Sequence, residues 1–218
     1  MTVTTLHCWV DKSRPLAEMI RRLLDRSNLL RHGAKLGLWV LIWITAVAVP
    51  ILIYAGAIQL TGNIDTVVPH KVYRSATLSA DDLRAVIRAA HIRTVINLRG
   101  EDSSQSWYRD EVRVTNAEHV RQIDLPLSAI REPGPALLVQ LTDALQTAET
   151  PMLLHCSSGS DRTGLAAALY ELLVEKKPPS VAGEQLSFYW GHFPWIISPT
   201  IAMDRTFAKV VASLPQDR

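Results

Sequence analysis

A run of 29 residues without a charged side chain, from Leu36 to Ile64, limits what this chain of 218 residues can fold into. Its centre, Leu38 to Ile58, is almost wholly apolar and matches the roughly 20 residues that a helix needs to cross a hydrocarbon core of about 30 Å. A membrane helix also tolerates Pro50, whose missing N–H weakens a helix in water. Core helices of soluble domains rarely need so long an uncharged run. The sequence therefore predicts one transmembrane helix over residues 36–60.

Positive charges are placed unevenly around this run. Residues 1–35 contain seven Lys and Arg against three Asp and Glu, whereas residues 66–218 contain sixteen against seventeen. An excess of Lys and Arg keeps a flanking segment in the cytoplasm. We therefore expect a single-pass protein of a bacterial inner membrane, with residues 1–35 in the cytoplasm and the domain of residues 66–218 in the periplasm. The near-neutral domain has no basic run, which argues against a nucleic-acid partner.

Residues 66–218 alternate short apolar runs with longer amphipathic runs. The short runs predict buried strands, at 94–98, 120–125 and 152–156. The longer runs predict helices, at 79–90, 103–118, 135–148, 163–175, 182–189 and 200–213, the first of them opened by a capping box at Ser79. This alternation predicts an α/β fold, with a sheet covered by helices on both faces. The two cysteines, Cys8 and Cys156, are too few for a disulfide framework.

The junction between the third predicted strand and the next helix carries the candidate chemistry. It contains Cys156 and Arg162, separated by five residues of which most are small. Such a junction aims several backbone N–H groups and a helix N-terminus at one point, which suits an anion. The same field favours the thiolate of Cys156, which is then a nucleophile near neutral pH. The planar fork of Arg162 can hold two phosphate oxygens.

The other residues of the junction are candidates for substrate binding. These are Ser157, Ser158, Gly159, Ser160 and Thr163. The hydroxyl of Thr163 is expected to donate to the sulfur, which makes the sulfur a better leaving group in a second step. Gly159 allows the loop to turn tightly and approach a ligand closely.

The pattern Cys156-x5-Arg162-Thr163, with His155 before it and Gly164 after it, resembles the signature of cysteine-dependent protein tyrosine and dual-specificity phosphatases. The likeness to the compact bacterial dual-specificity-like branch extends over residues 68–175, through the segments Val72–Ser75 and Val95–Arg99, and weakly to the turn at 191–194. It implies a dual-specificity-phosphatase-like sheet flanked by helices, with no metal and no cofactor. It also implies two chemical steps: Cys156 attacks phosphorus while an acid protonates the leaving oxygen, and water then hydrolyses the phosphocysteine.

Four carboxyl groups are candidates for the acid that protonates the leaving oxygen. In the resembling family this acid lies on a loop before the cysteine, and Asp124 ends the second predicted strand 32 residues before Cys156. Asp161 lies in the catalytic loop itself, as in some bacterial lipid- and tyrosine-phosphatase relatives. We rank Asp161 and Asp124 level, ahead of Glu132 in a loop bounded by Pro and Gly, and of Asp102.

The substrate is left open between three possibilities. The loop contains no Lys, unlike phosphatases of highly phosphorylated inositides, so the resemblance implies a phosphomonoester, on phosphotyrosine or phosphoserine proteins. The alternatives are a phospholipid headgroup such as phosphatidylglycerol phosphate, and an inactive module that only binds phosphate. Outside the loop, His155 is interpreted as orienting it, His192 as a packing residue, and Arg99 either as added charge at the pocket or as a surface ion pair.

Overall fold

The structure is a computed structural model that describes residues 14–193 and 198–215. The chain forms two compact units, Met1–Ile53 and Tyr54–Arg218. The first helix, α1, spans Arg14–Leu60 and contains Pro50. Within it, residues Gly37–Ile58 have a mean hydropathy of 2.3, and none of those whose burial the structure describes is buried, so this part of the helix is long and apolar enough to cross a membrane.

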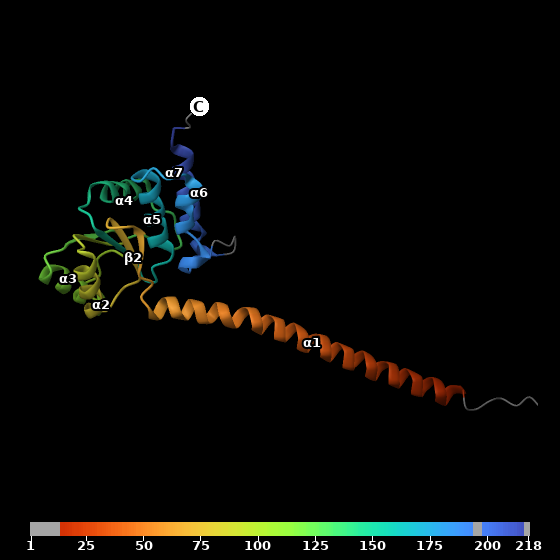
Figure 1. The fold of residues 1–218 in the computed structure, drawn as a ribbon. Helices are drawn as coiled ribbons and strands as arrows, with labels where there is room; N and C mark the ends of the chain where they lie inside the picture. Colours follow the sequence, from red (N-terminus) through yellow and green to blue (C-terminus); the bar gives the residue numbers. More distant parts are fainter. Residues whose placement is uncertain (1–13, 194–197, 216–218) are drawn as a thin grey trace, which may run out of the picture. The chain divides into compact units, whose positions relative to one another are not determined.

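A five-stranded sheet forms the centre of the second unit (Figure 1). Its strands are β1 (Asp65–Val68), β2 (Val72–Ser75), β3 (Thr94–Asn97), β4 (Arg121–Asp124) and β5 (Met152–His155), in the spatial order β1-β2-β5-β3-β4. Only β1 is antiparallel to its neighbour, and β2, β5, β3 and β4 are parallel. The carboxyl ends of four strands therefore meet at one edge, where β5 in the centre leads into the cysteine loop.

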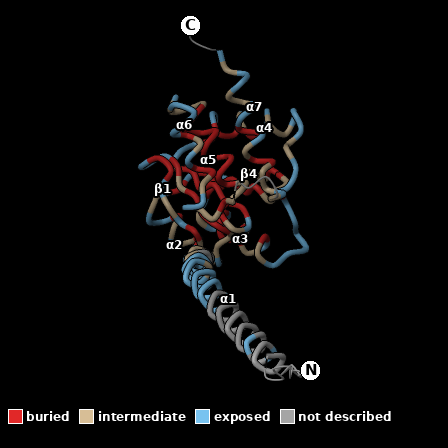
Figure 2. Tube along the Cα trace, turned by 90° about the vertical axis from the view of Figure 1, so that its right-hand side faces the viewer, coloured by how far each residue is buried: buried red, intermediate tan, exposed pale blue. Residues whose placement is uncertain are grey.

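Helices cover both faces of the sheet, as predicted. They are α2 (Ala80–Ala90), α3 (Ser106–Ala117), α4 (Pro135–Thr147), α5 (Asp161–Leu173), α6 (Pro179–Ala182) and α7 (Ala202–Ser213). Alternate strand residues point to opposite faces. Val95 and Leu153 pack with α2 and α3, whereas Ile96 and Leu154 belong to the larger core with α4, α5 and α7. Residues 163–172 of α5 are all buried, and Figure 2 shows burial concentrated in the strands and in this helix.

The sequence predictions hold for most elements, miss two strands and are wrong for one helix. The three predicted strands and the α/β architecture are confirmed, and Ser79 caps α2 by accepting the N–H of Asp82 at 3.2 Å. Strands β1 and β2 are absent from the sequence prediction, which has no strand before residue 94. The predicted helix at 182–189 is wrong: α6 ends at Ala182, and two 3-10 helices follow, Gly183–Gln185 and Phe188–Trp190.

Candidate active site

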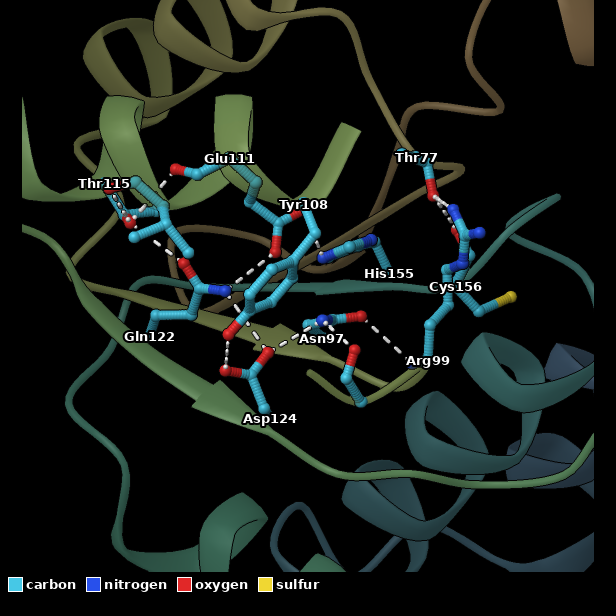
Figure 3. A network of polar contacts seen from close by, with 12 residues as sticks. Thr77, Asn97, Arg99, Tyr108, Glu111, Thr115, Gln122, Asp124, His155 and Cys156 are labelled. Atoms are coloured by element: carbon cyan, nitrogen blue, oxygen red, sulfur yellow. Dashed lines mark hydrogen bonds and ion pairs between the residues drawn. The ribbon is translucent and has the colours of Figure 1, made fainter. Parts of the chain in front are cut away.

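Cys156 directly follows the central strand β5, and 1% of the residue is exposed. Its carbonyl oxygen accepts a hydrogen bond from the hydroxyl of Thr77 at 2.9 Å. The N–H of Thr77 in turn donates to the carbonyl of Ser157 at 3.2 Å. Because Thr77 lies just beyond β2, the neighbouring strand fixes the start of the loop (Figure 3).

The loop between Cys156 and α5 turns its carbonyl groups toward the protein. Every carbonyl of residues 157–160 accepts a hydrogen bond: Ser157 from the Thr77 N–H (3.2 Å), Ser158 from Asn63 (3.0 Å), Gly159 from Arg74 (2.8 Å) and Ser160 from the Gly164 N–H (2.8 Å). Among the described residues, nothing accepts the N–H groups of residues 157–159. A peptide N–H points away from the neighbouring carbonyl. The N–H groups of Ser158 and Gly159 share their peptide planes with the bonded carbonyls of Ser157 and Ser158 and are left as donors for an anion.

Two side chains at the start of α5 add buried donors. Arg162 Nη1 donates to the carbonyl of Leu127 at 3.2 Å and lies 3.5 Å from that of Leu98. Arg162 Nε and Thr163 Oγ1 are buried and have no hydrogen-bond partner among the described residues. Buried polar atoms are nearly always paired in folded proteins, so two unpaired donors in the first turn of α5, directly after the cysteine loop, indicate a place for ligand oxygens.

Arg74 on β2 is a residue that the sequence analysis missed. It is fully buried, its Nη2 donates to Gly159, its Nη1 contacts Gln185, and its guanidinium lies 4.1 Å from the ring centre of Trp190. Burial lowers the pKa of Arg74 to about 10, although the charges of Cys156 and of two carboxylates oppose the shift. Arg74 therefore fixes the loop through its hydrogen bond to the Gly159 carbonyl and adds positive charge that acts on Cys156. The signal in the sequence was a charged residue inside a short apolar run.

Arg99 follows β3 and supplies a further cation near the site. Its Nη1 donates to Thr77 Oγ1 at 2.9 Å, and its guanidinium lies 3.6 Å from the ring centre of Trp107. Burial and the like charge of Arg162 lower the pKa of Arg99, while Cys156 opposes the shift. Of the two interpretations given above, the structure therefore favours added charge at the pocket.

Asp124, one of the two preferred acids, ends β4 inside a hydrogen-bond network. Its carboxylate accepts from Asn97 at 2.7 Å, from the hydroxyl of Tyr108 at 2.8 Å and from Gln122 at 3.2 Å. In Figure 3 these three side chains surround Asp124, and the sulfur of Cys156 lies on the other side of the view. Burial and the bond to Asp124 raise the pKa of Tyr108. The contacts of Asp124 fit a role in joining β3, β4 and α3.

The same network reaches the residue before the cysteine. His155 is buried, and its Nε2 lies 3.0 Å from Oε2 of the buried Glu111 on α3. Glu111 also accepts from Gln122 at 3.1 Å (Figure 3). This arrangement agrees with the interpretation of His155 as a residue that orients the loop.

Asp161, the other preferred acid, occupies the first turn of α5 and contacts a histidine. His192 Nδ1 lies 2.7 Å from Asp161 Oδ1, and His192 Nε2 lies 2.9 Å from Asp204 Oδ2 on α7. His192 is fully buried. Burial alone lowers the pKa of His192, but the bonds to Asp161 and Asp204 outweigh it and the net shift is upward. The interpretation of His192 as simple packing is therefore incomplete.

The two less favoured carboxyl groups have partners of their own. Glu132 forms an ion pair with Lys209 of α7 at 2.6 Å, and Asp102 accepts from the N–H of Ser104 at 3.2 Å.

Gly159 is the loop residue that tolerates substitution least. Its φ is +73°, and a Cβ added there would lie 2.8 Å from the backbone of Ser75 and Ala76. We expect Gly159→Ala to destabilise the domain by roughly 2 kcal/mol or more, because both the positive φ and the backbone clash count against it. Thermal unfolding measures this loss. Gly134→Ala is the matched control, since a Cβ there has no atom within 4 Å, and an equal fall in Tm for both variants would contradict the prediction.

A buried cysteine, a donor-lined loop and an arginine at the start of the next helix, on a mostly parallel sheet, define a cysteine-dependent phosphatase domain of the dual-specificity type. Comparison with known families supports this assignment. The chain belongs to the PTP-SAK family, described as a Swiss Army Knife protein, DSP-PTPase phosphatase domain, whose model matches residues 62–196, more than half of the chain.

The curated relatives belong to the same class. The dual specificity protein phosphatase TpbA of Pseudomonas aeruginosa strain UCBPP-PA14 is 32% identical over 117 residues, which are 53% of this chain and 49% of that protein. TpbA of strain PAO1 gives the same values. The chain thus spans about half the length of the curated relatives it matches.

Solved structures share the fold. The crystal structure of P. aeruginosa TpbA has a TM-score of 0.52 and 24% identity, covering 68% of this chain and 85% of that one. PTPMT1 in complex with PI(5)P gives a TM-score of 0.52 at 18% identity, covering 68% and 97%. The catalytic domain of the S. cerevisiae PP-IP phosphatase SIW14 gives 0.52 at 18%, covering 69% and 91%. These likenesses confirm the α/β fold of the dual-specificity type.

Proposed function

We propose that this chain hydrolyses phosphate monoesters through a phosphocysteine intermediate. The observation that carries the proposal is the site around Cys156: a buried sulfur next to unpaired loop N–H groups and the unpaired buried donors of Arg162 and Thr163. The loop N–H groups and Arg162 can donate to the oxygens of a phosphoryl group, and Thr163 can donate to the sulfur when the S–P bond breaks.

In the first step, the Cys156 thiolate attacks phosphorus, the S–P bond forms and the bond to the leaving oxygen breaks. The N–H groups of the loop and the fork of Arg162 stabilise the charge that spreads over the equatorial oxygens. Asp161 gives its proton to the leaving oxygen. We assign the acid to Asp161 rather than Asp124, because the three hydrogen bonds of Asp124 engage both of its oxygens.

In the second step, water attacks phosphorus and the P–S bond breaks. Asp161 takes the proton of the water, and the hydroxyl of Thr163 donates to the departing sulfur. The site residues Ser157, Ser158, Gly159 and Ser160 hold the phosphoryl group mainly through their backbone, because their carbonyls are already bound on the other side. Inorganic phosphate is released and the thiolate is regenerated.

We also propose that α1 anchors the domain in a membrane. The support is the apolar segment Gly37–Ile58 and the excess of positive charge in residues 1–35. In this proposal residues 36–60 span a bacterial inner membrane, with residues 1–35 in the cytoplasm and the catalytic domain, residues 66–218, in the periplasm.

Phosphorylated proteins are the substrate class that we propose, in line with the name of the relative TpbA. A phospholipid headgroup is the second candidate, and a specific observation favours it: four residues separate the end of α1 at Leu60 from the start of β1 at Asp65. So short a connection keeps the domain close to the end of the apolar helix, and hence to lipid headgroups if that helix spans a bilayer.

The proposal is tested by trapping the intermediate. The full chain in mild detergent is mixed with an aryl phosphate, quenched in denaturant within milliseconds and digested for mass spectrometry. We expect one added phosphoryl group on the peptide that contains Cys156. Turnover without such an adduct would contradict the mechanism, and neither adduct nor turnover would favour the inactive phosphate-binding module.

The substrate class is tested by comparing initial rates on a phosphotyrosine peptide and on phosphatidylglycerol phosphate in mixed vesicles. Faster release from the peptide supports the protein assignment. Faster release from the vesicles assigns the lipid.

A further inference from the structure

A buried histidine stands directly behind the acid that we assign. The turn that carries His192 is fixed against the catalytic loop: Gly191 has a φ of +78°, and a Cβ added there would lie 3.0 Å from Ser160 Oγ. The carbonyl of Trp190 accepts from Asn63, which also binds the loop at Ser158. The turn before His192 thus packs against the cysteine loop and shares the hydrogen-bond donor Asn63 with it.

Both ring nitrogens of His192 contact carboxylates, at 2.7 Å for Asp161 and 2.9 Å for Asp204. Within the described part of the chain, Asp161 on α5 and Asp204 on α7 are the charged groups that shift the pKa of His192. Arg162, the next residue after Asp161 on α5, is not among them. A neutral imidazole has one N–H. If it donates from Nε2 to Asp204, Nδ1 must accept, and Asp161 must then be the donor.

The contact between Asp161 Oδ1 and His192 Nδ1 therefore holds one proton that either group can carry. With the proton on His192, Asp161 is a carboxylate beside an imidazolium ion. With the proton on Asp161, His192 is neutral and Asp161 is an acid next to the catalytic loop. Asp204 holds the other ring proton in both states, which fixes the tautomer.

We propose that His192, held by Asp204, is the positioning residue that stores and returns the proton of Asp161; this rests on the function proposed above. In the first step the Nδ1 proton passes to Asp161 and a proton passes from Asp161 to the leaving oxygen, so that the pair loses one proton. In the second step Asp161 takes a proton from the attacking water, and the proton returns to Nδ1. The histidine never touches the substrate.

The raised pKa of His192 agrees with this role, because the hydrogen bonds to Asp161 and Asp204 stabilise a proton on the ring. The sign of the pH effect follows. The proton is present below the pKa of the pair and is lost above it, so kcat/KM should fall on the basic side. Removing a carboxylate that stabilises the imidazolium should move this basic limb to lower pH.

The test uses the full chain with His192→Asn and Asp204→Asn, because His192 is fully buried and its variant risks misfolding, whereas the Asp204 side chain is 29% exposed. The kcat/KM is measured for phenyl phosphate and p-nitrophenyl phosphate across pH. A stored proton matters most for the poor leaving group, so we expect a loss of about 10²-fold for phenyl phosphate and a much smaller loss for p-nitrophenyl phosphate. The basic limb of Asp204→Asn should also shift to lower pH.

Lys209→Gln is the matched control. It removes the ion pair of Lys209 with Glu132 from the same helix, α7, without touching His192, and should leave both rates and the pH profile unchanged. Equal losses for both leaving groups with an unshifted pH profile would make His192 a structural clamp between α5 and α7, and would overturn the inference while the proposed function stands. Absence of wild-type turnover would instead contradict the proposed function.

Discussion

Replacing Cys156 by serine is expected to abolish turnover, with a loss of roughly 10⁴-fold or more in kcat. The hydroxyl of serine is far less acidic than a thiol, so the loop and Arg162 cannot stabilise it as an anion at neutral pH. The side chain is buried and nearly isosteric, so the fold should survive. Phosphate release from p-nitrophenyl phosphate measures the effect.

Binding should persist in this variant, because the donors around the site are unchanged. Calorimetry with a phosphotyrosine peptide is expected to give a Kd within a few fold of that for the wild type. Cys8→Ser is the matched control, since Cys8 is the second cysteine of the chain and lies outside the described residues. Turnover that survives Cys156→Ser, or that is lost in Cys8→Ser, would contradict the assignment of the nucleophile.

Arg162→Lys is expected to lower kcat/KM by about 10³-fold, although it keeps the charge. A lysine ammonium is a point donor and cannot bind two oxygens with a planar fork. It also cannot replace Arg162 Nε, which is buried, has no partner within residues 14–193 and 198–215, and is therefore available to a phosphoryl oxygen. The loss should fall mainly on kcat, because the charge on the equatorial oxygens develops in the transition state.

Steady-state kinetics on p-nitrophenyl phosphate test this prediction. Arg113→Lys, at an exposed position paired with Asp110, is the control and should change neither parameter. If Arg162→Lys retained more than a tenth of the wild-type kcat/KM, a general positive charge would suffice and the bidentate role of Arg162 would be wrong.

The central features of the site were predictable because they are contiguous in sequence. From Cys156 to Gly164 the residue types, their spacing and the strand–helix junction are all local properties, and the structure has the junction where the sequence predicts it. The same holds for the buried strands at 94–98 and 152–156, whose apolar character follows from burial on both faces.

The supports of the loop were not predictable, because they come from distant parts of the chain. Asn63 binds the loop from 95 positions away and Arg74 from 85 positions away, and His192 contacts Asp161 across 31 positions. No periodicity or spacing rule connects residues at such separations. Asp124 was ranked by its distance in sequence from Cys156, a criterion that says nothing of the three hydrogen bonds that engage it.

The wrong helix at 182–189 has a local cause. The prediction treats residues 182–189 as one amphipathic run, but the chain leaves the helical conformation at Leu186 and Ser187, and the ring of Trp190 lies against the guanidinium of Arg74. The contacts of Trp190 with Asn63 and Arg74 determine the backbone conformation of this segment, and they outweigh its helix propensity.

The connection after α1 has a consequence for any attempt to detach the domain. Gly62 accepts the N–H of Ala76 at 2.7 Å, and the amide of Asn63 donates to Ser158 and Trp190. Cleavage after Asn63 would remove both residues from the folded domain. The Ala76 N–H would lose its acceptor and the carbonyls of Ser158 and Trp190 would lose their donor, at about 1–3 kcal/mol for each buried group. Proteolysis at this point would release a domain with a weakened cysteine loop, so the residues just before β1 are part of the folded domain.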